Sequence, residues 1–231
     1  MLKLLLIRHG QSEGNLVGRM EGISSTPLTA LGEHQSHRLG QRLGAEEWRP
    51  THVYCSPLRR ATATLSAMVE GFNASLDTLD NGPPSFTRLS PLIELRDELQ
   101  EYDHGIFNGL TWVEATERYP DLCASLEQSL DWRPIPQAET LEDGRRRSQR
   151  FVDYLLRCHQ NGDRVWVVSH HWILQQIIAR LLGCDRAWGL PMGNTARFEF
   201  WLDPSRWPDP GPNRLNTELW KIKRFNDCSH L

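Results

Sequence analysis

A short polar segment near the start of the chain carries residue types that can bind and transfer a phosphoryl group. Arg8, His9 and Gly10 stand together, and Asn15 follows five residues after Gly10. A phosphate needs several donors converging on its oxygens, and an arginine offers a planar fork of N–H groups. A neutral imidazole is a good nucleophile near pH 7, and nearby arginines disfavour its protonated form. The segment therefore predicts an anion site in which His9 attacks phosphorus and Gly10 lets the backbone approach the ligand.

Two further basic groups stand at comparable places in the sequence. Arg60 follows Ser56–Pro57, in the first turns of an expected helix, where the helix dipole also favours an anion. His170 follows the apolar run Val165–Val168 and would donate to the phosphate during transfer. Taken singly, these two residues also suit an exposed arginine and a buried histidine bonded to a carbonyl. A zinc site at His170 and its neighbour His171 is disfavoured, because adjacent side chains diverge and no other ligand motif accompanies them.

An acidic segment in the middle of the chain can supply a proton donor. Hydrolysis of a phosphoester requires a proton on the leaving oxygen, and a partly buried carboxyl group suits that task. Glu101 is the candidate, but the pattern alone does not choose it over its neighbours Glu94, Asp97, Glu98 and Asp103.

Apolar runs alternate with helical patterns along the chain, so the candidate groups must be positioned by a mixed fold. Strands are expected at Leu2–Ile7, His52–Cys55 and 165–168, with half-exposed strands at 195–202 and 218–225. Helices are expected after Thr29, with Leu31, Leu39 and Leu43 near one face, from Ser56–Pro57 to about Glu70, from Thr111, from Thr140 to about His159, and over 173–182. The pattern predicts an α/β fold, a three-layer α/β/α sandwich with a mostly parallel central sheet. In such sheets ligands bind beyond the carboxyl ends of the strands, where the three basic clusters fall.

The chain shows no internal repeat and no linker between domains. Its 231 residues suit one α/β domain spanning 1–231, with an inserted helical and loop subregion at about 71–138. Residues 71–92 are rich in Gly, Pro, Asn and Ser and are expected to form a loop.

The composition excludes some classes of partner. The net charge is -3 and the pI is about 6.3, so no overall positive field attracts nucleic acid. The apolar run Leu4–Ile7 is too short to cross a membrane, and five cysteines without a C-x-x-C pair indicate reduced thiols and a cytoplasmic location. The run Arg145–Arg147 falls inside an expected helix and is interpreted as a solvated face and a set of salt-bridge partners.

Several motifs in order resemble those of the histidine phosphatase superfamily, in its phosphoglycerate mutase-like branch. The opening R-H-G-x-[ST]-x-x-N pattern is matched from Arg8 to Asn15. Further matches are Gly18–Gly22, Pro27–Gly32, Ser56–Ala61, Leu99–Gly105, Gly109–Thr111, in part Ala138–Thr140, and Val167–His170. The ending Phe225–Leu231 resembles that of the broad-specificity phosphatase group.

The resemblance implies a role for each matched residue. It implies that His9 is phosphorylated, that Arg8, Arg60 and His170 bind the phosphate with help from Asn15, and that Glu101 donates the proton and then activates water. It implies no metal and no cofactor. The chain departs from the family pattern at His171 and Trp172, where glycine is usual after the second histidine, and at Glu21, Ser24 and Ser25 in the substrate loop. Glu21, Gly22 and His171 are therefore expected to contact the substrate.

These residues favour a phosphatase acting on a small phosphorylated metabolite through a phosphohistidine intermediate. The alternative is a cofactor-dependent phosphoglycerate mutase, but the stretch Tyr119–Gln137, where mutases carry several arginines, holds only Arg133. A third interpretation is a catalytically inactive module that binds phosphate or protein. The expected partner is a small phosphoester, with no nucleic acid and no membrane. The sequence leaves the oligomeric state open, and a homodimer is compatible with it. Trp112, Trp132 and Trp172 are hypothesised to line the leaving-group pocket.

Overall fold

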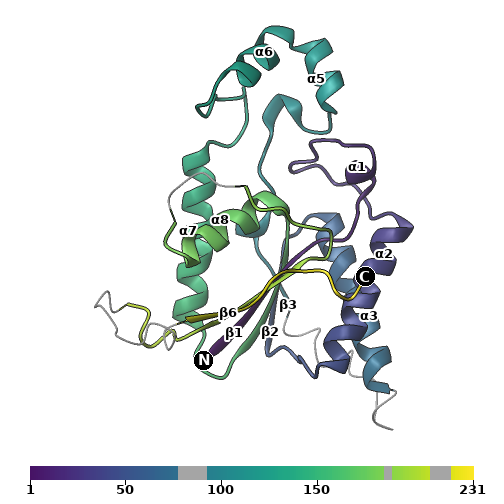
Figure 1. The fold of residues 1–231 in the computed structure, drawn as a ribbon, viewed down its shortest axis with the longest axis vertical. Helices are drawn as coiled ribbons and strands as arrows, with labels where there is room; N and C mark the ends of the chain where they lie inside the picture. Colours follow the sequence, from purple (N-terminus) through teal and green to yellow (C-terminus); the bar gives the residue numbers. More distant parts are fainter. Residues whose placement is uncertain (78–92, 185–188, 209–219) are drawn as a thin grey trace.

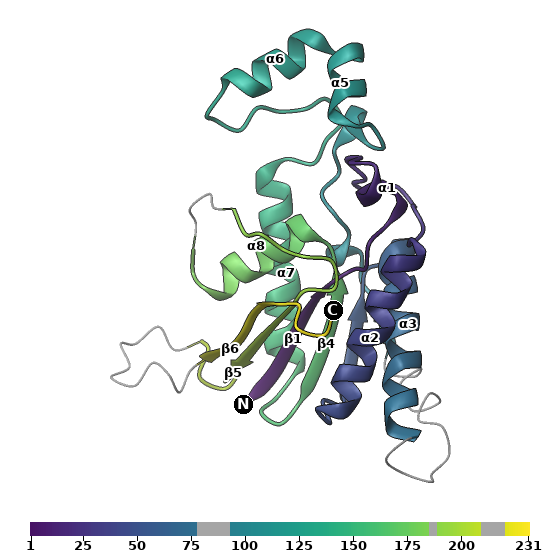
Figure 2. The ribbon, with the colours of Figure 1, turned by 45° about the vertical axis from the view of Figure 1, so that its right-hand side comes forward.

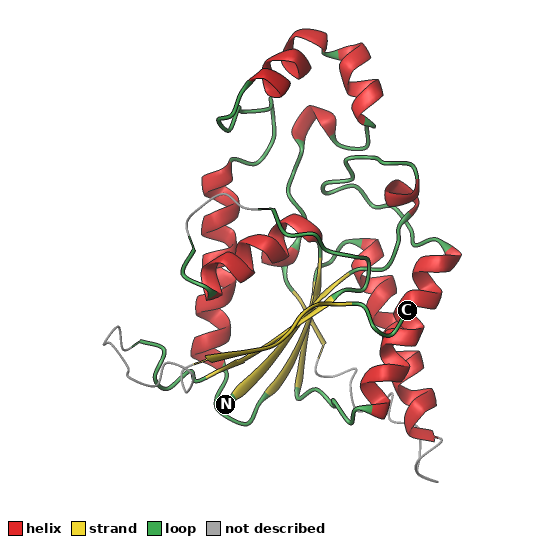
Figure 3. Cartoon of the chain, in the orientation of Figure 1, coloured by secondary structure: helices red, strands yellow, loops and turns green. Residues whose placement is uncertain are grey.

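The computed structural model describes residues 1–77, 93–184, 189–208 and 220–231, and its centre is a six-stranded sheet (Figures 1 and 3). The strands are β1 (Leu2–Arg8), β2 (His52–Cys55), β3 (Ile93–Leu95), β4 (Arg164–Ser169), β5 (Arg197–Leu202) and β6 (Trp220–Asp227), in the order β3-β2-β4-β1-β5-β6. The neighbours β3, β2, β4 and β1 are parallel, whereas β5 is antiparallel to both β1 and β6. The predicted, mostly parallel sheet is confirmed.

Two pairs of helices cover the two faces of the sheet (Figure 2). The helices α2 (Ala30–Ala45) and α3 (Arg59–Asp77) pack together on one face, and α7 (Leu141–Cys158) and α8 (His171–Leu181) pack on the other. Successive side chains of a strand point to opposite faces. In β1, Leu4 and Leu6 therefore join the core beneath α7 and α8, while Leu5 and Ile7 join the core beneath α2 and α3. Burial on both faces explains the unbroken apolar run and confirms the three-layer sandwich.

Three predicted helix starts are confirmed by their capping bonds. The hydroxyl of Thr29 accepts from the Gly32 amide at the start of α2, and the hydroxyl of Thr140 caps α7. Thr111 forms a capping box at α5 (Trp112–Arg118). The remaining helices are short: α1 (Glu13–Leu16), α6 (Pro120–Gln128) and the 3-10 turns η2 (Asp97–Leu99) and η3 (Gly105–Phe107). Helices α5 and α6 lie at the end of the molecule beyond the sheet (Figure 1).

Two predictions about α3 are wrong. The helix begins at Arg59 and not at Pro57, although the Ser56 hydroxyl accepts from the Leu58 amide as a cap would and also bonds the ring of His170. The helix also continues to Asp77, so residues 71–77 are helical and not part of the expected loop. Phe72 is fully buried in the core beneath α2 and α3, which explains why packing overrides the loop-like composition. The rest of that predicted loop, 78–92, lies outside the described residues.

The predicted apolar face of α2 is also only partly correct. Leu39 and Leu43 are fully buried, whereas Leu31 is 51% exposed. At 100° per residue, Leu31 lies about 80° around the helix from Leu39, which takes it off the buried stripe.

Two further observations concern the whole described chain. Among the residues that the structure describes, no helix combines the length and the apolar character that crossing a bilayer requires. All five cysteines lie in described segments and are free thiols.

Candidate active site

The carboxyl ends of three parallel strands bring the predicted groups together. Arg8 ends β1 and pairs in register with Ser169, the last residue of β4. His9 and His170 follow directly, and the amide of His9 donates to the carbonyl of Ser169 at 2.9 Å. Ser56 follows β2 at the same edge. The imidazole rings of His9 and His170 have centroids 5.1 Å apart, so residues distant in sequence meet at this edge, as the strand pattern predicted.

His9 is a buried, neutral imidazole with a defined tautomer. Its side chain is shielded from solvent, and this burial, followed by the charges of Arg60 and Arg8, lowers the pKa of His9 well below 6.5. The Nδ1 atom lies 2.7 Å from the carbonyl oxygen of Gly10, which can only accept a hydrogen bond. The single ring proton therefore belongs on Nδ1, and Nε2 keeps its lone pair.

His170 is also buried, and one of its nitrogens has no protein partner. Burial, then the charges of Arg60 and its neighbours, lowers the pKa of His170 well below 6.5. Its Nε2 lies 2.7 Å from the hydroxyl of Ser56, which accepts from the Leu58 amide and can donate its own proton to the ring. The ring proton then belongs on Nδ1, which has no hydrogen-bond partner among the described residues. Nδ1 is thus a donor available to an anion.

A buried guanidinium group, that of Arg60, and a half-buried one, that of Arg8, flank the histidines. Arg60, only 1% exposed, donates to the carbonyls of Ser24 and Gly22, both at 2.7 Å, and Arg8 donates to the carbonyl of Met192. Burial lowers the pKa of both arginines, although nearby carboxylates offset part of that effect. The Nε atoms of both arginines also lack a hydrogen-bond partner within the described chain. A buried donor without a partner costs about 1–3 kcal/mol, so three such donors beside His9 form a site suited to a multiply charged oxyanion.

The expected substrate loop, which contains Glu21 and Gly22, places a buried carboxylate beside Arg60. Glu21 accepts from the Ser12 hydroxyl at 2.7 Å and from Asn15 Nδ2 at 2.8 Å, and Thr26 donates to its other oxygen. Its Oε2 lies 3.8 Å from Arg60 Nε. The structure therefore brings Glu21 and Asn15 beside Arg60 but bonds them to each other. Gly22, the third expected residue of this loop, contributes the carbonyl that Arg60 contacts.

Glu101 caps the helix that follows His170. Its Oε1 accepts from the Ile173 amide and its Oε2 from the Trp172 amide, both at 3.2 Å, at the start of α8. Its charge also acts on Arg8 and Arg60. The competing carboxylates Glu94 and Glu98 instead pair with Arg96, at 2.6 and 3.1 Å. Glu101 is thus the carboxylate of the acidic segment whose charge acts on both guanidinium groups, and its role as proton donor stays a prediction.

Arg147 fixes the backbone next to Glu101. It donates to the carbonyls of Glu98 at 2.9 Å and Gln100 at 2.5 Å, and it pairs with Glu139 at 2.7 Å. The expected solvated face is therefore wrong for Arg147, whereas its expected role as a salt-bridge partner is confirmed by the pair with Glu139. A periodic signal was available, because Arg147 lies four residues before the buried Phe151 on the inner face of α7.

The unusual residues after His170 occupy different places. His171 Nε2 lies 2.9 Å from the carbonyl of Leu190. Trp172 lies against Gly144 of α7, and its ring centroid is 4.8 Å from that of Tyr102. These two rings form a cluster with the ring of Trp132. Trp112 is not in that cluster, since it packs against Phe107 and donates to Glu127.

Two supporting residues escaped the sequence analysis, and one glycine has a further reason for its place. Asn194 donates to the His9 carbonyl at 3.2 Å and to Asn15 Oδ1 at 2.9 Å. Ser56 was expected only as a helix cap. At Gly10, a side chain would collide with the Gly32 carbonyl and the Ser36 hydroxyl of α2. Helix packing therefore requires this glycine, and the close approach of a ligand that the sequence suggested stays a prediction.

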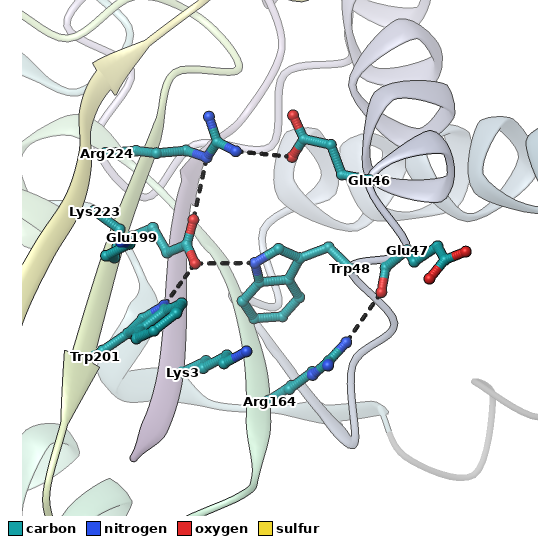
Figure 4. A pocket seen from close by; sticks show the side chains of 9 residues that line it. All are labelled: Lys3, Glu46, Glu47, Trp48, Arg164, Glu199, Trp201, Lys223 and Arg224. Carbon is teal, nitrogen blue, oxygen red and sulfur yellow. Dashed lines mark hydrogen bonds and ion pairs between the residues drawn. The ribbon is translucent and has the colours of Figure 1, made fainter.

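A separate cavity of about 420 Å³ lies at the opposite, amino ends of β1 and β4 (Figure 4). Its centre is the buried Glu199, which accepts from the indole nitrogens of Trp48 at 3.2 Å and Trp201 at 2.7 Å and from Arg224 at 3.1 Å. These mutual bonds satisfy the polar groups within the protein, unlike the donors around His9.

Known proteins resemble this chain over nearly its whole length. A family model described as "Histidine phosphatase superfamily (branch 1)" matches residues 4–81 and 86–208. A metal-independent phosphoserine phosphatase of Arabidopsis thaliana is 26% identical over 230 residues, covering 99% of this chain and 83% of that protein. A Citrobacter koseri protein named "Probable phosphoglycerate mutase GpmB" is 28% identical over 242 residues, covering 100% and 95%. The structure of Bacillus stearothermophilus YhfR aligns with a TM-score of 0.73 at 24% identity, covering 100% and 99%.

Proposed function

Because this chain belongs to the histidine phosphatase superfamily, branch 1, we propose that it hydrolyses phosphomonoesters of small metabolites through a phosphohistidine formed at His9. One observation carries the proposal. A neutral imidazole with a free Nε2 lone pair lies among three buried donors that have no hydrogen-bond partner within the described chain: Arg8 Nε, Arg60 Nε and His170 Nδ1. Such an arrangement suits a tetrahedral anion bound in front of a nucleophile.

In the first step, Nε2 of His9 attacks phosphorus and the bond from phosphorus to the ester oxygen breaks. The protonated carboxyl group of Glu101 gives its proton to the leaving oxygen. The transition state of phosphoryl transfer is loose and highly charged, so Arg8, Arg60 and His170 contribute chiefly by electrostatic stabilisation. The amides of Trp172 and Ile173 orient the Glu101 carboxyl group for this role.

In the second step, water attacks the phosphohistidine and the bond between nitrogen and phosphorus breaks. Glu101, now a carboxylate, accepts the proton of the attacking water, and His9 returns to its starting form with release of inorganic phosphate. Glu21 and Asn15 keep Arg60 and the loop in place through the bonds described above. His171 and the cluster of Tyr102, Trp132 and Trp172 are proposed to shape the side of the site that receives the leaving group. The proposed steps use side chains only and require no metal ion.

A phosphoglycerate mutase is the alternative, and the name of the Citrobacter relative favours it. A mutase must retain a bisphosphorylated intermediate between two half-reactions. Between Tyr119 and Gln137 only Arg133 is basic, and its Nε donates to the Ser129 hydroxyl in an exposed segment. An assay with 3-phosphoglycerate, with and without 2,3-bisphosphoglycerate, distinguishes the two activities. Isomerisation of 3-phosphoglycerate that depends on the bisphosphate, without net release of phosphate, would favour the mutase over the phosphatase.

The direct test is to trap the phosphoenzyme during turnover of p-nitrophenyl phosphate. Rapid quenching followed by peptide mass spectrometry should find one phosphoryl group on His9. His9→Ala should lose both the label and the hydrolysis, by at least about 10³-fold. The matched control is His34→Ala, which changes an exposed histidine of α2 and should keep both. Hydrolysis that persists in His9→Ala would reject the mechanism, and a wild-type chain with no activity on any phosphoester would favour the inactive binding module.

A further inference from the structure

Two histidines and an aspartate meet at the end of the sheet opposite to His9. His52 begins β2, His159 follows the last residue of α7, and Asp163 precedes β4. One ligand atom from each of the three lies within 4.8 Å of the others. Since β2 runs from His52 toward Ser56, this cluster is about one strand length, roughly 13 Å, from the proposed active site. We propose that His52, His159 and Asp163 form a binding site for a divalent transition metal ion of the zinc class.

The spacing of the ligand atoms fits a shared ion. Nδ1 of His159 and Oδ2 of Asp163 are 3.1 Å apart, close to the roughly 3.4 Å between neighbouring ligands around tetrahedral zinc. The rings of His52 and His159 have centroids 4.5 Å apart at 71°, so they meet at an edge and do not stack. The His159 side chain is only 1% exposed and that of Asp163 is 19% exposed. The site is thus anchored in the protein but open on one side, where water can supply a fourth ligand.

The hydrogen bond at His52 leaves the nitrogen that a metal requires. Nδ1 of His52 lies 2.9 Å from the hydroxyl of Thr51, and the same hydroxyl lies 3.0 Å from the carbonyl of Arg164. A carbonyl can only accept, so the hydroxyl proton points to Arg164 and Nδ1–H of His52 donates to Thr51. The lone pair of His52 is then on Nε2. Metal-bound histidines are typically oriented in this way by a hydrogen bond on the other ring nitrogen.

A hydrogen bond permits the same arrangement at His159. Its Nε2 lies 2.9 Å from the Tyr54 hydroxyl. When that hydroxyl accepts, the proton of His159 belongs on Nε2. Its Nδ1 lone pair then faces the Asp163 carboxylate at 3.1 Å, and a bound cation between these two acceptors removes their repulsion. In the metal-free chain, the Tyr54 hydroxyl can instead donate to His159, whose Nδ1–H then donates to Asp163.

The chemistry of the three ligand side chains indicates which metal would bind and what it would do. Two imidazole nitrogens and one carboxylate suit zinc and its neighbours, whereas magnesium and calcium prefer oxygen ligands. The ion would join the start of β2, the end of α7 and the turn into β4, and so stabilise the folded chain. It would take no part in the proposed hydrolysis, since no residue of the cluster contacts the groups around His9 in the hydrogen bonds described above.

The test measures metal binding in chain stripped with a chelator and then desalted. Titration with Zn²⁺ should give one ion per chain, and Co²⁺ should give the intense visible absorption of a tetrahedral site. The melting temperature should rise by several degrees with Zn²⁺. His52→Gln and Asp163→Asn should each weaken binding at least about 10-fold, while their melting temperatures without metal stay near that of the wild type. Phosphatase activity should be the same with and without Zn²⁺.

The matched control is the double variant His34→Gln with His37→Gln, which removes two histidines one turn apart on α2. This variant should bind Zn²⁺ as the wild type does. A wild-type chain without stoichiometric binding would overturn the proposal. Unchanged binding in His52→Gln, or loss of binding in the α2 variant, would also overturn it and would indicate adventitious binding by surface histidines.

Discussion

The rings of His9 and His170 lie 5.1 Å apart, and burial together with the same two guanidinium groups holds both of them neutral. Neutrality gives the two rings different tasks, because each has one proton and one lone pair. The carbonyl of Gly10 directs the lone pair of His9 to Nε2, and the hydroxyl of Ser56 directs the proton of His170 to Nδ1. One imidazole is therefore prepared to attack and the other to donate.

The first prediction concerns the protonation of these two rings. Their pKa values are lowered well below 6.5, so in the folded chain both should remain neutral as the pH falls through 6.5. NMR titration of the ring Cε1–H signals, assigned with His9→Gln and His170→Gln, measures this directly. The same signals in urea-denatured chain serve as the control and should titrate near 6.5. If the folded and denatured chains titrate together, the neutral nucleophile inferred for His9 does not exist.

The second prediction concerns the positioning of Glu101 by Arg147. Arg147→Met removes the donors to the carbonyls of Glu98 and Gln100, so the Glu101 carboxyl group should lose its orientation. We expect kcat to fall by about 10- to 100-fold for alkyl phosphates, whose leaving groups need a proton. It should change little for p-nitrophenyl phosphate, whose leaving group does not.

Arg146→Met is the matched control for Arg147, because it changes the neighbouring arginine, which is exposed and which, among the described residues, pairs with Glu142 and Asp143 of the same helix at 3.6 Å. It should leave kcat unchanged for both substrates. An equal loss on both substrates in Arg147→Met would argue for a general structural defect instead of a lost proton donor.

The third prediction concerns the contact between Gly10 and α2. In Gly10→Ala the new methyl group meets the Gly32 carbonyl and the Ser36 hydroxyl, and the surrounding backbone has little room to move. Overpacking of this kind costs about 1–3 kcal/mol in the free energy of unfolding, which urea denaturation would detect. Gly189→Ala is the control, since no heavy atom lies within 4 Å of the added methyl group. Equal free energies of unfolding for the two variants would contradict this prediction and would show that α2 moves to accommodate the methyl group.

The fourth prediction concerns acid stability and His230. Its side chain is 4% exposed, and burial, followed by the charge of Arg197, lowers its pKa from 6.5 to about 4. Between pH 6.5 and about 4, His230 is therefore protonated in the unfolded chain and neutral in the folded chain. The contribution of His230 is fully present above about 6.5 and is lost as the pH falls toward about 4.

The measurement for His230 is the free energy of unfolding as a function of pH. Over that pH range His230→Gln should take up about one proton fewer on unfolding than the wild type, so its stability should depend less steeply on pH. His34→Gln, which changes an exposed histidine, should retain a slope nearer that of the wild type. Identical slopes for the wild type and His230→Gln would show that His230 titrates normally.

Local patterns predicted the sheet and the meeting of His9 with His170 at its edge, because both depend on short-range rules. Apolar runs followed closely by polar and basic residues identified the ends of β1 and β4, and parallel topology then brought His9 and His170 together. Contacts between residues distant in the sequence could not be predicted from such rules. Ser56 fits the pattern of a helix cap, yet His170, 114 residues away, bonds its hydroxyl. Asn194 contacts His9 across 185 residues and belongs to no local pattern.

The errors in α3 and α7 have the same physical origin. The composition of residues 71–77 favours a loop, but packing against α2 extends the helix to Asp77. Three consecutive arginines suggested a solvated surface, but the inward direction of one of them is set by carbonyls on another segment. In both cases tertiary partners outweighed the local preference of the sequence.

The capping of α8 by Glu101 places two demands on one carboxyl group. An amide or a shorter acid at this position would sacrifice part of the helix start together with any proton transfer. Substitution of Glu101 should therefore be selected against for two reasons, the start of α8 and the proposed proton transfer. We expect the residue to be retained in descendants of this chain even where the substrate changes.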